Sequence, residues 1–401
     1  MYYFIFILIL LLLIFPIPAA IVSFFGMGYF NQKVSYLFMF IFVLGISLFA
    51  LYYSPNISDD FYRYQQNMRI MRAATGIPDL FSLINSNTTL NYQSDSILFN
   101  VLEYFITKTS RFNLLPYIST VITYGSILFP LVDLKVHGYI NRIVFFWLSI
   151  QTLLLFSLFF TFNTMRWAIA CALFFLILYF YNKTQLKRYL YLFVIPILFH
   201  LGIILAVALT IYFYFIKKVS IKKVLPVLLS LIIYLNIAKL FTGTGTIARI
   251  AQMTTGYSTD FMNRNTNGLI VLFLHRLVTI LIISSAMIYI YRKAKAKTNS
   301  KLDRVLIVFT ICLILLSGSM IQNRYLLVVS LIALLDIGMS YFNTKLVLTQ
   351  FDVLLILIMT LISVSASSII AYADVKDMMF SQPFIEVFFS NIFSLLKNIP
   401  I

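Results

Sequence analysis

Long apolar runs separated by short polar segments fill most of this chain. A helix needs about 20 apolar residues to cross the ~30 Å hydrocarbon core of a membrane. Ten runs are of roughly that length, and we expect membrane-spanning helices at about residues 2–24, 34–53, 113–133, 142–161, 164–181, 224–241, 268–291, 305–321, 324–342 and 348–372. Backbone polar groups find no water inside a bilayer, so these runs predict an all-α polytopic membrane protein.

Two longer polar segments and the end of the chain complete the predicted organisation. Residues 54–112 follow the second apolar run, and residues 242–267 precede the seventh. We expect each segment to form a large loop between membrane helices. The tail, residues 373–401, contains an amphipathic stretch that predicts a helix lying along the membrane interface. All of these parts belong to one integral membrane domain, residues 1–401.

The segment Arg188–Phe215 is apolar, but a single crossing here conflicts with the distribution of charge. A single crossing would place the basic residues before and after this segment on opposite sides of the membrane, whereas Lys and Arg are usually concentrated in cytoplasmic loops. A turn at residues 200–202 removes the conflict and leaves two arms of about 16–20 Å, too short to cross. Pro196 and Gly202 both disfavour a continuous helix. We therefore predict a re-entrant hairpin over residues 189–215, with both large polar loops on the outer side.

Composition agrees with this class of protein. The chain is 61% hydrophobic and 11% charged, with a mean hydropathy of +0.96. Its net charge of +17 comes mostly from Lys and Arg in short loops, which orient the helices and attract anionic lipid, so we expect no nucleic-acid partner. Cys171 and Cys312 lie inside apolar runs, and no CxxC motif or Cys/His cluster accompanies them, so we expect no structural zinc.

Two arginines beside apolar runs are the first candidates for a functional site. Arg166 lies near the middle of the apolar stretch Ile143–Asn182, and Arg324 separates the runs Val305–Met320 and Tyr325–Tyr341. A guanidinium at bilayer depth costs roughly 2.5–3.5 kcal/mol, and such residues usually mark a function. Both suit an anionic ligand at the lipid boundary. The structural alternative is an arginine that bonds loop carbonyls or extends to the interface.

The two outer loops and the hairpin tip carry the remaining candidates. Asp59 and Asp60 begin the first loop and suit a general base or a cation site, and helix capping is the alternative. His200 lies at the hairpin tip, and its alternative is a buried structural histidine. The loop residues suited to phosphate binding are Arg63, Arg249 and Arg264. The loop residues suited to stacking on sugar rings are Tyr62, Tyr64 and Tyr257. A flexible connector would explain the second loop equally well.

Four short motifs, in their order along the chain, resemble the EpsG/Wzy-like polymerases of bacterial surface polysaccharides. They are Asp59-Asp60-Phe61-Tyr62-Arg63-Tyr64, Arg166-Trp167-Ala168-Ile169, Lys187-Arg188 followed by Phe199-His200, and Arg324-Tyr325. Two positions depart from the usual pattern of the family. Trp167 stands where many relatives carry Gln, and Gly202 stands where Phe-His is typically followed by x-Ser. These departures alter the polar surroundings of Arg166 and His200 and leave the two residues themselves in place.

The resemblance implies a glycosyltransferase of the bacterial inner membrane whose active site faces the periplasm or exterior. It would transfer a growing glycan from undecaprenyl pyrophosphate to a sugar hydroxyl of the next lipid-linked oligosaccharide. Arg166, Arg324, Arg249 and Arg264 would hold the pyrophosphate. The base would be Asp60 or Asp59, with His200 as the second choice. No cofactor is expected, although a divalent metal at Asp59 and Asp60 stays open.

The expected partners follow from the same resemblance. They are the lipid-linked oligosaccharides, membrane lipids, and the chain-length regulator and flippase of the same pathway. Two other functions stay open. One is a different membrane glycosyltransferase, either an O-antigen ligase or an enzyme that uses a polyprenyl-phosphate sugar. The other is a non-catalytic flippase, against which stand the lack of an evident internal repeat and the one-sided placement of the polar residues.

Overall fold

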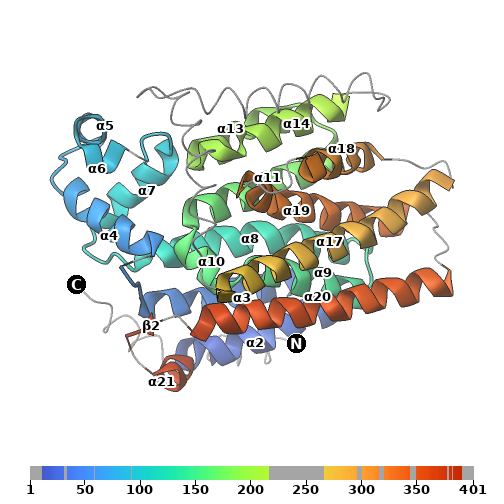
Figure 1. Ribbon diagram of the computed structural model, residues 1–401. Helices are drawn as coiled ribbons and strands as arrows, with labels where there is room; N and C mark the ends of the chain where they lie inside the picture. Colours follow the sequence, from blue (N-terminus) through green and yellow to red (C-terminus); the bar gives the residue numbers. More distant parts are fainter. Residues whose placement is uncertain are drawn as a thin grey trace. The chain divides into compact units, whose positions relative to one another are not determined.

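The computed structural model describes residues 11–30, 34–57, 59–91, 93–215, 266–295, 300–315, 320–343, 349–376, 379–381 and 383–390 (Figure 1). Helices predominate among these residues, in agreement with the predicted all-α class. The chain divides into two compact units. The N-terminal unit consists of Met1–Ile203 and Ala371–Ile401, and the inserted unit consists of Ile204–Ile370.

Four apolar helices pack in series in the N-terminal unit: α2 (Pro16–Tyr29), α3 (Val34–Ser47), α8 (Leu114–Val136) and α11 (Met165–Thr184). The first two helices approach closely at Gly45, where an added Cβ would lie 2.5 Å from the Pro16 carbonyl oxygen. A small residue at a helix contact lets two backbones pack tightly, as is common between membrane helices. This packing gives the unit a helical frame from which shorter segments project.

A predicted crossing, residues 142–161, is divided into α9 (Arg142–Leu155) and α10 (Leu158–Asn163). Ser157 causes the division locally, because its Oγ accepts a hydrogen bond from the Phe160 amide at 3.2 Å and so caps α10. The carbonyl of Phe156, left without a helical partner, accepts a bond from the Tyr124 hydroxyl at 2.8 Å. The break places the short α10 directly before the start of α11.

The predicted first outer loop is itself largely helical. After η1 (Leu48–Tyr52) and β1 (Tyr53–Ser54) it forms α4 (Asp60–Met71), α5 (Ile77–Ser86), α6 (Thr88–Asn91) and α7 (Ile97–Thr107). Helices α4 and α7 pack on each other, and the Thr107 hydroxyl donates to the Met68 carbonyl at 2.6 Å. The later segment β2 (Met379–Phe380) pairs antiparallel with β1, and α21 (Phe384–Phe389) packs against α2 and η1. The end of the chain is thus tied to the start of this segment.

The helix break predicted at residues 200–202 is present. The chain forms α12 (Arg188–Leu192), α13 (Val194–Phe199) and η2 (Leu201–Ile203), and His200 between the last two has an extended backbone, with φ −156° and ψ 112°. Helix α13 packs against α11 and α7. The next helix, α14 (Ile204–Phe215), belongs to the inserted unit, so the re-entrant turn itself stays a prediction.

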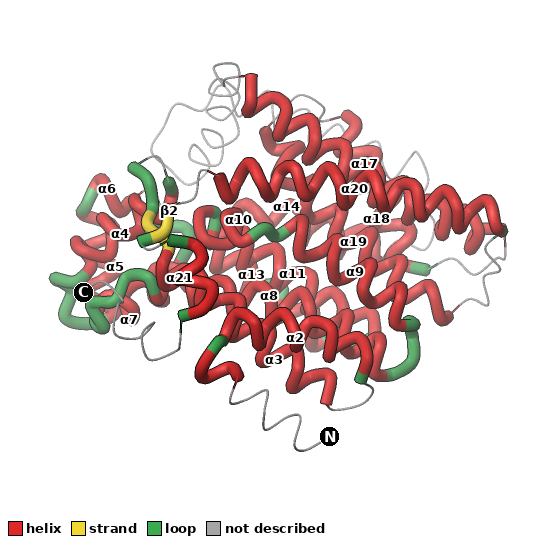
Figure 2. Tube along the Cα trace, turned by 90° about the horizontal axis from the view of Figure 1, so that it is seen from below, coloured by secondary structure: helices red, strands yellow, loops and turns green. Residues whose placement is uncertain are grey.

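The inserted unit contains α14, α17 (Thr266–Lys295), α18 (Lys301–Leu315), α19 (Met320–Asn343) and most of α20 (Gln350–Lys376). Helix α19 packs against both α17 and α18, as the views in Figures 1 and 2 agree. Arg292 near the end of α17 forms an ion pair with Asp352 at the start of α20, at 2.5 Å. The predicted crossing 224–241 lies outside the described residues.

Four helical stretches among the described residues are long and apolar enough to cross a membrane: Val34–Tyr52, Leu114–Val136, Met165–Thr184 and Arg276–Lys295. Each coincides with a predicted crossing. Further apolar helices, such as α9, are shorter than a full crossing. The fold is therefore a helical bundle with several apolar helices compatible with a membrane protein.

Candidate functional site

Several predicted site residues of the N-terminal unit lie around the start of α11. Asn163 ends α10, and its side-chain oxygen accepts hydrogen bonds from the backbone amides of Asp60 at 2.5 Å and Phe61 at 3.3 Å. It thereby satisfies amides in the first turn of α4, which have no partner within their own helix. One side chain thus links the Asp59-Asp60 motif to the segment that carries Arg166.

The two adjacent aspartates have different surroundings. Asp59 is buried at the N-cap position of α4, and its Oδ2 accepts from the Tyr53 hydroxyl at 2.6 Å and the Asn56 amide at 2.8 Å. These two bonds fix the buried carboxylate in the turn before α4. Asp60 is partly exposed and forms an ion pair with Arg63. Asp59 therefore lies at the N-cap position, but its side chain forms no capping hydrogen bond with α4, and Asn163 accepts from the first amides of that helix.

Arg166 lies in the first turn of α11 and is partly buried. Its Nε donates to the Tyr64 hydroxyl at 3.1 Å, and one terminal nitrogen donates to Ser96 Oγ at 3.4 Å. The guanidinium carbon also lies 5.5 Å from the centre of the Tyr64 ring, within the range of a cation–π interaction. Groups from α4 and from the turn before α7 therefore orient this arginine.

The sequence analysis did not identify a buried carboxylate that is influenced by the charge of this arginine. Glu103 of α7 is fully buried, and Gln93 donates to its Oε2 at 2.8 Å. Burial raises the pKa of Glu103 to about 8, although the positive charge of Arg166 and the bond from Gln93 act in the opposite direction. Among the described residues, Glu103 Oε1 and Asn100 Oδ1 have no hydrogen-bond partner. The available signal was the spacing of Asn100 and Glu103, which places both on one face of an otherwise apolar helix.

His200 approaches the same helix end from α13. Its ring lies edge-on to Trp167, with 5.2 Å between the ring centres, and its Nδ1 accepts from the Gly202 amide at 2.9 Å. A Cβ at Gly202 would lie 2.8 Å from the His200 ring, so glycine leaves room for this turn. Trp167 follows Arg166 directly. The structure therefore brings Tyr64, Arg166 and His200 around the start of α11.

The other predicted residues are not part of this arrangement. Tyr62 is partly buried on α4. Arg324 lies in the first turns of α19, within the inserted unit, rather than in a bend between two helices. Arg249, Arg264 and Tyr257 lie outside the described residues.

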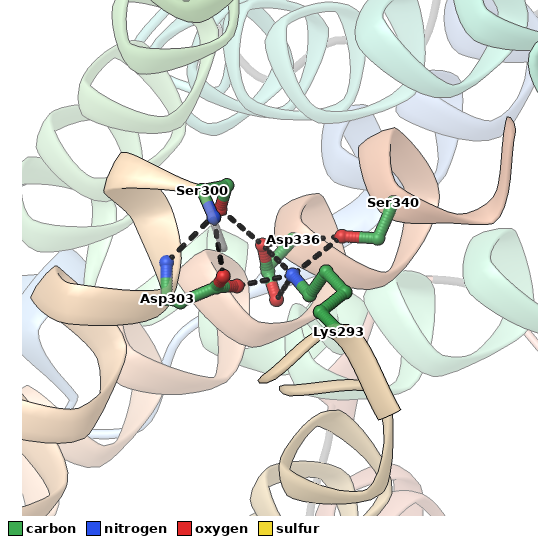
Figure 3. Close-up of polar contacts among 5 residues, drawn as sticks. All are labelled: Lys293, Ser300, Asp303, Asp336 and Ser340. Atoms are coloured by element: carbon green, nitrogen blue, oxygen red, sulfur yellow. Dashed lines mark hydrogen bonds and ion pairs between the residues drawn. The ribbon is translucent and has the colours of Figure 1, made fainter. Parts of the chain in front are cut away.

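A second polar cluster, absent from the predictions, lies in the inserted unit (Figure 3). Lys293 from α17 is buried and forms ion pairs with Asp303 of α18 and Asp336 of α19, the latter at 2.9 Å. It also donates to Ser340 at 2.7 Å. From the sequence, Lys293 is one of the short-loop Lys and Arg residues that account for most of the net charge. The missed signal was Asp336, a carboxylate inside an apolar run that requires a cationic partner.

A third cluster lies at the ends of three helices of the N-terminal unit. Asp133 of α8 accepts from Tyr36 of α3 at 2.5 Å, and it also contacts Tyr179 and Lys183 of α11. These bonds fix the three helices against one another. Like the Lys293 cluster, this group lies at helix ends that the charge distribution predicts to be cytoplasmic.

Within the described parts of the chain, no three His, Cys, Asp or Glu side chains form a group that could hold a metal ion. Asp59 and Asp60 are directed to separate partners, Tyr53 and Arg63 respectively. Comparison of the chain with models of protein families, with curated proteins and with solved structures finds no match.

Proposed function

We propose that this protein is a polymerase of a bacterial surface polysaccharide. It joins oligosaccharide units carried on undecaprenyl pyrophosphate, at the outer face of the inner membrane. This proposal includes ten crossings and a re-entrant hairpin over residues 189–215. The observation that supports it best is the oriented Arg166 at the start of an apolar helix, held by Tyr64 and Ser96.

The proposed reaction requires a cation beside the leaving pyrophosphate. The anomeric carbon of the growing chain leaves its pyrophosphate oxygen and bonds to a sugar hydroxyl of the next unit. Negative charge develops on the pyrophosphate, which Arg166 stabilises, and the hydroxyl proton passes to a base. Loss of one such charge-stabilising group typically costs about 10²–10³ in rate. Tyr64 and Tyr62 are the aromatic residues of α4 available for sugar contacts.

The first test is a gel of surface polysaccharide from the native strain. It compares the gene deletion with rescue by wild type, by Arg166→Ala and by Arg111→Ala. Arg111 is exposed in the same outer segment, so its replacement is a matched control for loss of charge. We expect deletion and Arg166→Ala to reduce the ladder to single repeat units, and wild type and Arg111→Ala to restore it. A full ladder from Arg166→Ala would remove the arginine from the mechanism.

The Lys293 cluster supports a second candidate function. Ionisable side chains buried among apolar helices often mark ion pathways of transporters. A flippase coupled to an ion would therefore also fit Lys293, Asp303 and Asp336. The same gel separates the two functions. If deletion removes all surface glycan while single units stay lipid-linked, the protein is a flippase or ligase. A product that differs by a single sugar would identify a transferase that uses a polyprenyl-phosphate sugar.

A further inference from the structure

We infer that Glu103 is the base of the Arg166 site, which takes the proton from the attacking sugar hydroxyl. This inference rests on the function proposed above and adds a catalytic residue to it. Four observations carry it: the orientation of the carboxyl group, its nearness to Arg166, its acidity, and the occupation of the other candidate bases.

The carboxyl group of Glu103 is fixed on one side and unbonded on the other. Gln93 holds Oε2 at 2.8 Å, and Gln93 is itself bonded through its carbonyl oxygen to the Asn100 side chain at 3.0 Å. Oε1 has no partner among the described residues, although it is buried. A buried acceptor without a partner is costly, and such atoms in native proteins call for a specific explanation. A substrate hydroxyl supplies the missing partner, and it donates to Oε1 when Glu103 is ionised.

We expect Glu103 to contact the same substrate that Arg166 binds. The charge of Arg166 acts directly on Glu103, while Arg166 is bonded to Ser96 in the turn that begins α7. A lipid pyrophosphate bound at Arg166 therefore places its reacting sugar near α7. Because Oε1 is not accessible to solvent in the free protein, a sugar hydroxyl reaches it only if the side chains packed around it move.

The raised pKa of Glu103 also suits a general base. A general base works best when its pKa lies near the operating pH, and burial raises the pKa of Glu103 to about 8. An ordinary carboxylate with a pKa near 4 is a far weaker base towards a hydroxyl. At neutral pH roughly a tenth of the molecules would carry ionised Glu103, and this fraction grows as the pH approaches 8.

The three bases predicted from the sequence have structural roles instead. Asp59 accepts from Tyr53 and Asn56 in the turn before α4, and Asp60 is paired with Arg63. The Nδ1 atom of His200 accepts the Gly202 amide and so maintains the turn after α13. Each of these groups already has a bonded partner, whereas Glu103 Oε1 has none among the described residues.

The proton and electron balance is complete with these groups. The hydroxyl oxygen bonds to the anomeric carbon as its proton moves to Glu103 Oε1. The bond from that carbon to the pyrophosphate oxygen breaks, and the electron pair leaves with the pyrophosphate beside Arg166. Glu103 then releases its proton to water before the next cycle.

The test measures polymerisation by membranes that contain wild type, Glu103→Gln or Glu103→Asp. The substrate is the lipid-linked repeat unit extracted from the deletion strain, and initial rates are measured from about pH 5.5 to 9. Asp79→Asn, which removes a carboxylate from the start of α5, is the matched control. We expect the wild-type and control rates to rise with pH, with a midpoint near pH 8. Glu103→Gln should lose about 10²–10⁴ in kcat, with KM unchanged and no rise of the rate across this pH range. Glu103→Asp should recover part of the rate.

The outcomes distinguish this assignment from the polymerase itself. If wild-type membranes make no polymer, the proposed function fails and the assignment fails with it. If wild type and Glu103→Gln make polymer at similar rates with the same pH profile, only the assignment is overturned. If Glu103→Gln raises KM and leaves kcat and the pH profile unchanged, Glu103 shapes the binding site and is not the base. Membrane levels of each variant are measured on immunoblots, so that rates refer to equal amounts of protein.

Discussion

Arg166 shows how neighbouring side chains prepare a residue for anion binding. Its guanidinium is bonded to Tyr64 and Ser96 and lies against the Tyr64 ring. An arginine that is already oriented loses less side-chain freedom on binding a phosphate, so more of the interaction contributes to affinity. A guanidinium is also suited to the paired hydrogen bonds that phosphate accepts. Trp167, the next residue along α11, packs against His200.

Glu103 makes the stability of the folded protein depend on pH. Its pKa is raised from 4.5 to about 8, so between these values the folded protein holds a proton that the unfolded chain has lost. Stability therefore falls as the pH rises through this window, by up to about 1.4 kcal/mol per pH unit. We expect the Tm of the purified protein in detergent to decrease by several degrees from about pH 5 to 8. The decrease should be smaller for Glu103→Gln; equal decreases would show that the folded-state pKa is not raised.

At the scale of elements, Asn163 joins two helices that carry site residues. Its side chain accepts from two amides of α4, and α4 in turn presents Tyr64 to Arg166. We expect Asn163→Ala to cost about 1 kcal/mol of stability, as for other lost helix caps, and also to reduce polymer formation because α4 shifts.

Asn141→Ala is the matched control for this element-scale prediction. Asn141 caps α9 through a bond from the Val144 amide at 2.9 Å, and Val144 belongs to no part of the site. The two variants should lose similar Tm, measured in detergent, while only Asn163→Ala shortens the glycan ladder on a gel. Equal ladders from both variants would show that the link from α10 to α4 does not matter for activity.

The sequence predicted some of these elements well for physical reasons that can be named. The positions of α8 and α11 could be predicted from the length of their apolar runs, because runs of about 20 apolar residues are typical of membrane-spanning helices. The break at His200 followed from Pro196, Gly202 and the distribution of charge. The division between α9 and α10 was not predicted, because it depends on a capping bond from Ser157 within a run that is apolar overall.

The site was only partly predictable for a related reason. Arg166 and Tyr64 were found because a charge or a motif marked them, and the structure places them in contact. Glu103 was missed because its burial and its nearness to Arg166 are tertiary properties, which separation by more than sixty residues hides. The Lys293 cluster was missed because a lysine in a basic loop resembles a solvated residue until Asp303 and Asp336 surround it.

At the scale of the whole molecule, the Lys293 cluster bears on the choice between polymerase and transporter. Lys293, Asp303 and Asp336 are all buried and join three helices of the inserted unit (Figure 3). Removal of one partner from a buried ion pair usually costs about 3–5 kcal/mol, because an unpaired charge stays buried. We therefore expect Lys293→Met alone to lower the membrane level of the protein sharply on immunoblots.

Neutralising the whole cluster separates its structural role from an ionic one. The triple variant Lys293→Met, Asp303→Asn, Asp336→Asn removes every charge of the group at similar volume, and such replacements are often nearly neutral for stability. We expect it to restore most of the protein level. In a polymerase the cluster only joins helices, so the glycan ladder should return together with the protein. A triple variant at the normal level that yields no surface glycan would instead show that the charges themselves are used. That result would favour an ion-coupled transporter, because the charges of an ion pathway cannot be exchanged for neutral side chains of similar volume.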